Sequence, residues 1–172
     1  CQRRAPPWHA AWAPFRYAWP LDRLEARFKF GADLAAGRLL ARMWCAAPAP
    51  AELPQAIVAV PLHHARLRSR GYNQALELAA PLAQALRLPL LRDALHRTRA
   101  TDAQSELTAV ARRRNVRGAF VARFDGEAPR HLAILDDVFT TGATLAECVR
   151  TLQRAGVARV DVWALARAPV GK

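Results

Sequence analysis

The chain has 172 residues, of which 52% are hydrophobic, and it carries a formal charge of +12. This length and apolar content suit one sizeable core with a short appendage. No apolar run reaches the roughly 18 to 20 residues of a membrane span, and residues 1–7 lack the apolar core of a signal peptide. We therefore expect a soluble, cytoplasmic protein without a membrane span.

The positive charge is concentrated in the middle of the chain. Residues 61–125 hold 12 Arg against 5 acids, whereas residues 126–172 hold 6 basic and 5 acidic residues. Such a segment attracts phosphate groups, either of a nucleotide-like ligand or of nucleic acid. A compositional bias toward arginine is the alternative explanation, because the chain has 24 Arg and only 2 Lys.

The N-terminal third is predicted to be partly irregular and partly helical. Residues 1–20 are rich in Trp and Pro, which disfavours helix and indicates an irregular arm packed by its aromatic rings. Apolar residues recur at helical spacing over 21–43 and predict one or two helices. The prolines of 48–54 indicate a linker, so we divide the chain into an arm and helix, residues 1–50, and a main domain, residues 51–172.

The main domain begins with a wholly apolar run at 56–60, which predicts a strand buried on both faces. A loop is expected at 61–72. Asn73 is a plausible N-cap for a helix that reaches about Arg87, with a kink or break at Pro81.

A polar, arginine-rich insert at 97–117 follows a possible strand at 88–95 and precedes a predicted strand at 118–124. A short helix is possible near 105–114. Long polar inserts of this kind are often functional flaps.

The C-terminal part alternates strand, helix and strand at 131–135, 143–155 and 159–166, with Gly156 as the helix stop. This alternation predicts an α/β fold with a mostly parallel sheet flanked by helices. Ligands of such sheets usually bind at the carboxyl ends of the strands.

The turn that joins the strand at 131–135 to the helix at 143–155 has the composition of a phosphate site. Its backbone N–H groups, the positive end of the helix dipole and the hydroxyls of Thr140, Thr141 and Thr144 suit a phosphate monoester. Gly142 permits close approach of the backbone.

Two acids, Asp136 and Asp137, precede this turn. Carboxylates repel a phosphate, but they accept hydrogen bonds from the two hydroxyls of a ribose or bind a hydrated Mg2+. Together with the turn they indicate a ribose 5-phosphate site. The alternative is that these residues only cap the loop and the helix. The sequence lacks the glycine patterns of P-loop and Rossmann nucleotide sites.

These residues carry a resemblance to known proteins. The segment 132–145 resembles the signature of type I phosphoribosyltransferases, and the chain is more closely similar to the ComF/GntX family of phosphoribosyltransferase-like proteins associated with competence. The shared motifs are Val60-Pro61-Leu62, Arg70-Gly71-Tyr72-Asn73-Gln74, Gln104, Arg114-Asn115-Val116 and Ala119-Phe120.

The resemblance implies a type I phosphoribosyltransferase-like fold that binds 5-phosphoribosyl-1-pyrophosphate (PRPP). Asp136 and Asp137 would hold the ribose hydroxyls as catalytic residues and contact Mg2+ through water. The segment Thr140, Thr141, Gly142, Ala143 and Thr144 would cradle the 5-phosphate.

The pyrophosphate of PRPP would meet residues that follow the first strand of the main domain, namely Pro61, Leu62, His63, Arg66 and Arg70. The insert at 97–117 would be the flexible loop that closes over PRPP, with Arg99, Gln104, Arg112, Arg113 and Arg114 as its candidate contacts. For Arg66, Arg70 and Arg112 to Arg114, each taken alone, a solvated surface position is an equal alternative. The adjacent His63 and His64 do not converge on a metal, and we interpret them as loop residues.

Members of this family commonly begin with a cysteine-rich zinc-binding module, but Cys1 is the only cysteine before Cys45. We interpret Cys1 as the remnant of a CxxC pair, with an incidental surface cysteine as the alternative. Zn2+ is expected only in a complete module and not in this chain.

The resulting hypothesis is a PRPP-binding protein that transfers phosphoribosyl to an unknown nitrogen acceptor and is linked to competence and DNA uptake. The N-terminal arm and helix at 1–50 would form the hood that selects the acceptor. Two alternatives stay open: a non-catalytic single-stranded-DNA-binding accessory of natural transformation, and a PRPP-sensing regulator. Partners in the competence machinery or a second copy of the chain are compatible with each of them.

Overall fold

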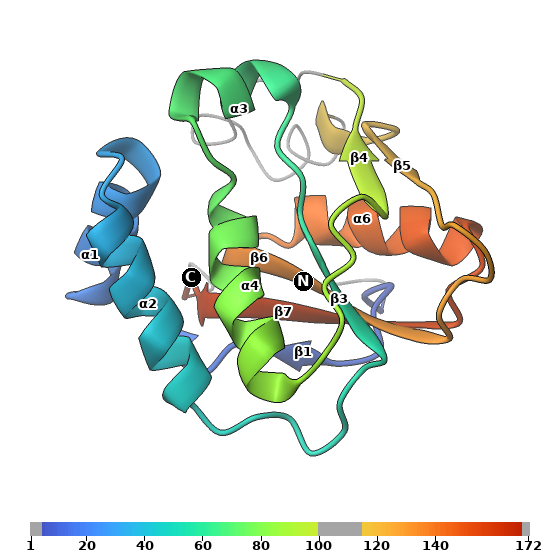
Figure 1. The fold of residues 1–172 in the computed structure, drawn as a ribbon, viewed down its shortest axis with the longest axis horizontal. Coiled ribbons are helices and arrows are strands. Elements are labelled where there is room, and N and C mark those ends of the chain that lie inside the picture. Colours follow the sequence, from blue (N-terminus) through green and yellow to red (C-terminus); the bar gives the residue numbers. More distant parts are fainter. Residues whose placement is uncertain (1–4, 100–114, 170–172) are drawn as a thin grey trace.

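The structure is a computed structural model that describes residues 5–99 and 115–169 (Figure 1). A parallel sheet forms its centre, with strand order β1-β7-β6-β3 and with β2 also paired to β7. Its strands are β1 (Ala11–Trp12), β2 (Phe15–Arg16), β3 (Ala56–Ala59), β6 (His131–Phe139) and β7 (Arg159–Arg167).

Helices flank this sheet. They are α1 (Leu21–Phe30), α2 (Leu34–Ala46), α3 (His64–Arg70), α4 (Gln74–Leu86) and α6 (Ala143–Arg154). Helix α4 contacts β3 and β6 and supports α2, whereas α6 contacts β6 and β7. Figure 1 shows α4 in front of the sheet and α1 at the end toward which β7 points. None of the described helices is long and apolar enough to cross a membrane.

The sequence explains why the sheet is central. Residues 132–135 of β6 and 160–166 of β7 are all buried, which requires cover on both faces of the sheet. Side chains of successive strand residues point to opposite faces, so continuous apolar runs lie between two layers of helices. The predicted α/β fold with a mostly parallel sheet is confirmed.

A second, small sheet lies beside the main one. It pairs β4 (Leu95–Arg97) with β5 (Phe120–Ala122) in antiparallel fashion. The strand expected at 88–95 is therefore mostly wrong in position, because within it only Leu90 forms an isolated bridge, to Ile57, before β4 begins. The short helix expected near 105–114 lies outside the described residues.

Several local expectations are corrected. The arm expected to be irregular adds β1 and β2 to the edge of the sheet, because their backbones pair with β7. The loop expected at 61–72 contains α3. Helix α4 runs unbroken past Pro81 from its predicted N-cap, Asn73, whose side chain accepts from Ala75 N–H. Strand β6 continues through both acids to Phe139.

Candidate functional site

A cavity of about 480 Å³ opens at the carboxyl ends of β3 and β6. It is bounded by the end of α1, by α3 with the start of α4, by β4 and by the turn between β6 and α6. Its lining comprises Lys29, Phe30, Val60, Leu62, Arg66, Ser69, Arg70, Gln74, Arg97, Asp136, Asp137, Val138, Thr140, Gly142, Ala143, Thr144 and Leu145. Among the described residues, the structure therefore brings together most of those that the sequence singled out.

The predicted phosphate turn forms one wall of this cavity. Thr140, Gly142, Ala143 and Thr144 line it, whereas Thr141 is exposed and lies outside the lining. Gly142 is the N-cap of α6 and has no side chain to cap the helix. A bound anion at this position would receive the first backbone N–H groups of α6 and the positive end of its dipole.

The backbone conformation at position 142 and the neighbouring side chains both require a glycine there. Its φ of 70° lies in the left-handed region, where side chains with a Cβ are strained. A Cβ added there would approach Phe139 Cε2 to 2.7 Å and Trp8 to 3.1 Å. The glycine thus faces two aromatic rings, which pack edge to face with centroids 5.4 Å apart.

The two acids occupy successive positions of β6, so their side chains point to opposite faces of the strand. Asp137 is buried and its Oδ2 lies 3.0 Å from Lys29 Nζ of α1. Asp137 Oδ1 accepts the Val138 N–H at 2.7 Å, and Asp136 Oδ1 accepts the Asp137 N–H at 3.0 Å. Both Asp137 oxygens are therefore engaged within the protein.

The surroundings of the two carboxyl groups shift their pKa values in opposite directions. Burial raises the pKa of Asp136 well above its ordinary value, and the negative charge of Asp137 raises it further. Burial acts in the same direction on Asp137, but the Lys29 ammonium and its hydrogen bond outweigh it and lower the pKa of Asp137. Asp137 is consequently held as the carboxylate beside the cation.

Lys29 is the main site residue that sequence reasoning missed. It contacts a second buried carboxylate, Glu25 Oε1, at 3.2 Å, and Glu25 Oε2 accepts the Tyr17 hydroxyl at 3.1 Å. Burial disfavours the charged ammonium, but the charges of Asp137 and Glu25 more than offset this and raise the pKa of Lys29. One signal was available in the sequence: the other lysine of the chain is Lys172, among 24 arginines.

Three of the five residues expected at the pyrophosphate line the cavity: Leu62, Arg66 and Arg70. Pro61 and His63 do not. His63 instead caps α3, because its Nδ1 accepts the Ala65 N–H at 3.3 Å. The interpretation of His63 and His64 as loop residues is therefore corrected, because His63 is the N-cap of α3 and His64 is its first residue.

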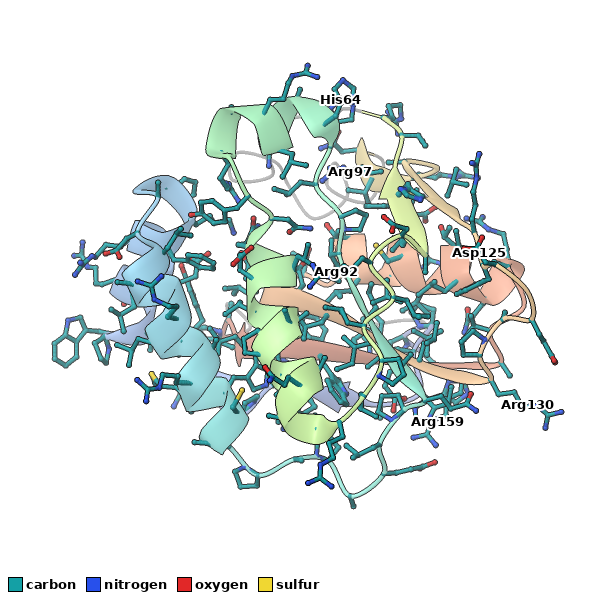
Figure 2. The ribbon with its side chains drawn as sticks, viewed as in Figure 1. His64, Arg92, Arg97, Asp125, Arg130 and Arg159 are labelled. Atoms are coloured by element: carbon teal, nitrogen blue, oxygen red, sulfur yellow. The ribbon has the colours of Figure 1, made fainter. Side chains whose placement is uncertain are left out.

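Arg97 also lines the cavity and was not predicted. It comes from β4, and its guanidinium lies 5.5 Å from the centroid of the Phe120 ring. Burial lowers the pKa of Arg97, and the positive charge of Arg66 acts in the same direction. Figure 2 shows Arg97 nearer the sheet than His64, with Arg130 and Arg159 at the other end of the molecule.

The expected flexible loop is described only at its two ends, residues 97–99 and 115–117. Arg99 donates to the carbonyl oxygens of Asn115 at 3.1 Å and Arg117 at 2.8 Å, so it lies near the loop base and not in the cavity lining. The other expected contacts, Gln104 and Arg112, Arg113 and Arg114, lie outside the described residues, as does Cys1. Cys45 and Cys148 are free thiols.

The fold and the site together define a parallel α/β domain with an anion-suited turn and two acids at the carboxyl ends of its strands. No protein-family model matches the chain. It is 40% identical to competence protein F of Haemophilus influenzae over 98% of this chain and 77% of that protein. It is 38% identical to the DNA utilization protein YhgH of Escherichia coli over 97% of this chain and 76% of that protein.

The chain therefore belongs to the family of competence protein F and DNA utilization protein YhgH, in agreement with the resemblance read from its motifs. Among solved structures, a glutamine phosphoribosylpyrophosphate amidotransferase from B. subtilis superposes with a TM-score of 0.47 at 22% identity. The match covers 75% of this chain and 25% of that one.

Proposed function

We propose that the cavity binds PRPP and that the protein acts as a phosphoribosyltransferase in DNA utilization. The observation that supports this most is the placement of Asp136 beside the uncapped start of α6 within one cavity. Acceptors for ribose hydroxyls and donors for a phosphate then lie at opposite ends of a ribose 5-phosphate unit. The role in DNA utilization rests on the names of the relatives.

In this proposal each wall of the cavity has a part. The turn from Thr140 to Thr144 holds the 5-phosphate, and Asp136 accepts from the ribose hydroxyls. Arg66 and Arg70 project from α3 and attract the pyrophosphate. Asp137 acts mainly through Lys29, because its own oxygens are already engaged.

The donor set fits Mg2+ only in combination with the ligand. Mg2+ prefers oxygen ligands and is usually held by one or two carboxylates plus substrate phosphates and water. Asp136 would supply that carboxylate, directly or through water, while Asp137 is retained by Lys29. Bound Mg2+ would neutralise the pyrophosphate and make it a better leaving group.

The transfer itself would form a bond between a nitrogen lone pair of the acceptor and C1 of the ribose. The C1–O bond to pyrophosphate breaks, pyrophosphate leaves with the electron pair, and the acceptor N–H proton passes to water. The protein would contribute positioning and stabilisation of charge. Without an acceptor subsite the same pocket would serve as a PRPP sensor, so turnover must be measured separately.

Calorimetry with PRPP in the presence and absence of Mg2+ tests binding, and release of pyrophosphate across a panel of nitrogen acceptors tests transfer. We expect saturable binding that Mg2+ strengthens. Absence of both heat and thermal shift at millimolar PRPP would exclude the proposed function.

Replacing Asp136 with Asn should weaken PRPP binding and stabilise the free protein. Loss of charged hydrogen bonds to the ribose should lower the affinity at least about tenfold. The raised pKa of Asp136 means that its ionisation destabilises the fold as pH rises from about 4 through the folded pKa. Asn removes that charge, so its gain in thermal stability should be larger at pH 8 than at pH 4.

Titration calorimetry and melting curves at the two pH values check both effects. Normal binding of PRPP by the Asp136→Asn variant would show that Asp136 does not contact the ligand. Equal gains in stability at pH 4 and pH 8 would contradict its raised pKa.

A second candidate function, binding of single-stranded DNA, is favoured by the surface of the first two helices. We use the name basic face for four exposed residues on or beside these helices, namely Trp19, Arg23, Arg38 and Arg42. Trp19 is 80% exposed just before α1. Arg23 on α1 and Arg38 and Arg42 on α2 are exposed as well. Arginines attract the DNA backbone, and an exposed aromatic ring offers a stacking platform for a base.

Replacing the three arginines of the basic face with Ala should weaken binding of oligo(dT) and reduce the slope of log affinity against log salt by about 2. Fluorescence anisotropy at several salt concentrations measures the slope. Three exposed arginines elsewhere in the fold, Arg92, Arg130 and Arg150, provide the matched triple-Ala control. Equal slopes for the two triple variants would reject the basic face. The same measurement on a variant in which Ala replaces Arg112, Arg113 and Arg114 tests whether the loop binds single-stranded DNA.

A further inference from the structure

The last two residues of α1, Lys29 and Phe30, line the cavity, and neither was given a direct contact with PRPP in the proposal above. We propose that they form the acceptor subsite and that the acceptor is a planar aromatic heterocycle with an exocyclic carbonyl group. The ring stacks on Phe30 and the carbonyl oxygen accepts a hydrogen bond from Lys29. This inference rests on the proposed function, since it places the acceptor in the same cavity.

Lys29 has a donor to spare. An ammonium group carries three N–H donors, and Lys29 Nζ has two carboxylate neighbours, Asp137 Oδ2 at 3.0 Å and Glu25 Oε1 at 3.2 Å. The side chain is 26% exposed, and the residue lines the cavity, so the remaining donor serves a ligand. Because two carboxylates hold the ammonium in advance, a ligand orders little further side-chain freedom.

Phe30 differs from the other aromatic residue at this end of α1. Phe28 is 1% exposed and packs in the core, whereas Phe30 is 78% exposed at the cavity. The guanidinium of Arg70 lies 5.9 Å from the centroid of the Phe30 ring. The ring therefore offers a face for stacking to a planar ligand, beside a second donor group.

The position of this pair is fixed by contacts on both sides of α1. The Tyr72 hydroxyl donates to the backbone carbonyl of Phe28, and the ion pair of Lys29 with Asp137 joins the helix to β6. Gly37 of α2 lies against the Phe28 ring, where a Cβ would come within 2.4 Å. Lys29 and Phe30 thus face the cavity from a rigid support.

The charges near Phe30 select the chemistry of the acceptor. Lys29 and Arg70 are both cationic and both donate hydrogen bonds, so they disfavour an aliphatic ammonium and an exocyclic amino group. A carbonyl oxygen on an aromatic ring suits both. Stacking requires the ring to be planar.

Three probes that share ribose 5-phosphate isolate the contribution of the base: ribose 5-phosphate, inosine 5′-monophosphate and adenosine 5′-monophosphate. Inosine 5′-monophosphate carries a carbonyl where adenosine 5′-monophosphate carries an amino group. Calorimetry should show inosine 5′-monophosphate binding at least about tenfold tighter than ribose 5-phosphate, as a stacked base provides. Adenosine 5′-monophosphate should bind more weakly than the inosine compound.

Variants test the stacking. Phe30→Ala should lower the affinity ratio of inosine 5′-monophosphate to ribose 5-phosphate at least about fivefold, as expected for a lost stacking contact, while Phe30→Tyr keeps the ratio high. Leu39→Ala removes a side chain of α2 that is 47% exposed and outside the cavity lining, and should leave the ratio unchanged.

The outcomes separate this inference from the proposed function. No binding of ribose 5-phosphate or PRPP to the unaltered protein would overturn both. Binding of ribose 5-phosphate without a gain from the base, or an unchanged ratio in Phe30→Ala, would overturn the subsite alone. Equal affinity for the two nucleotides would overturn the role of Lys29 as the carbonyl donor.

Discussion

Replacing Lys29 with Met is expected to lower the free energy of unfolding by about 3 kcal/mol, the cost of leaving buried charges without their partner. Asp137 and Glu25 are 4% and 2% exposed and both depend on this ammonium. In the variant the pKa of Asp137 should rise, because the cation that lowers it is gone. Urea denaturation measures the loss, and titration of Asp137 by NMR measures the shift.

A matched control lies on the same helix. Arg27 pairs with Asp33 at 2.6 Å, but the Arg27 side chain is 68% exposed. Arg27→Met should cost no more than about 1 kcal/mol, as is usual for exposed ion pairs. The double variant Lys29→Met with Asp137→Asn should lose less than the sum of its single changes. Equal losses for Lys29→Met and Arg27→Met would show that the buried pair does not stabilise the fold.

The stabilisation by Asp137 has a defined pH range. Its pKa in the folded protein is lowered, so the stability it provides is present above the unfolded value of about 3.9. It is lost as pH falls through the folded pKa. The stability difference between the unaltered protein and Lys29→Met should therefore be largest near neutral pH and shrink in acid.

Replacing Gly142 with Ala should cost about 2 to 4 kcal/mol of stability. Backbone strain at φ 70° contributes about 1 kcal/mol, and forcing the new methyl against Phe139 contributes the rest. The added Cβ points at the aromatic rings and not at the proposed phosphate site. Loss of PRPP binding would then follow from displacement of the turn.

Gly71 provides the matched control, since its φ is 86° but nothing lies within 4 Å of an added Cβ. Gly71→Ala should cost only the strain, about 1 kcal/mol. Phe139→Leu, by shortening the clashing ring, should lessen the additional cost of Gly142→Ala. Thermal and urea unfolding of these variants decide the matter. Equal costs at Gly71 and Gly142 would exclude the ring contact as the cause.

The sequence predicted the elements that have a clear local signal, either a continuous apolar run or a helix bounded by capping residues. The apolar runs that became β3, β6 and β7 are continuous, and α4 and α6 were bounded correctly by Asn73 and Gly156 within a residue or two. The turn proposed to bind phosphate was singled out because threonines, a glycine and a strand–helix junction coincide there, and the structure places it in the cavity wall. Local patterns of this kind do not depend on distant parts of the chain.

Other features depend on tertiary contacts and could not be read locally. The arm residues at 11–16 are strands only because β7 offers them a free edge. Lys29 joins the site only because α1 lies over the end of β6. The sequence predicted that this strand ends at residue 135. Strand β6 instead continues through Asp136 and Asp137, because its pairing with β7 extends beyond them.

The pairing of β1 with β7 joins two segments that are far apart in the sequence, and this affects the order in which contacts form during folding. Its pairing with β7 is fixed in part by Ala10 N–H, which donates to Asp161 across a separation of 151 residues. Closing so long a loop is entropically costly, so contacts of this range form late. Trp8, which supports the turn at Gly142, lies on this same segment. The turn at Gly142 should therefore gain its final rigidity in one of the last steps of folding, after most of the core has formed.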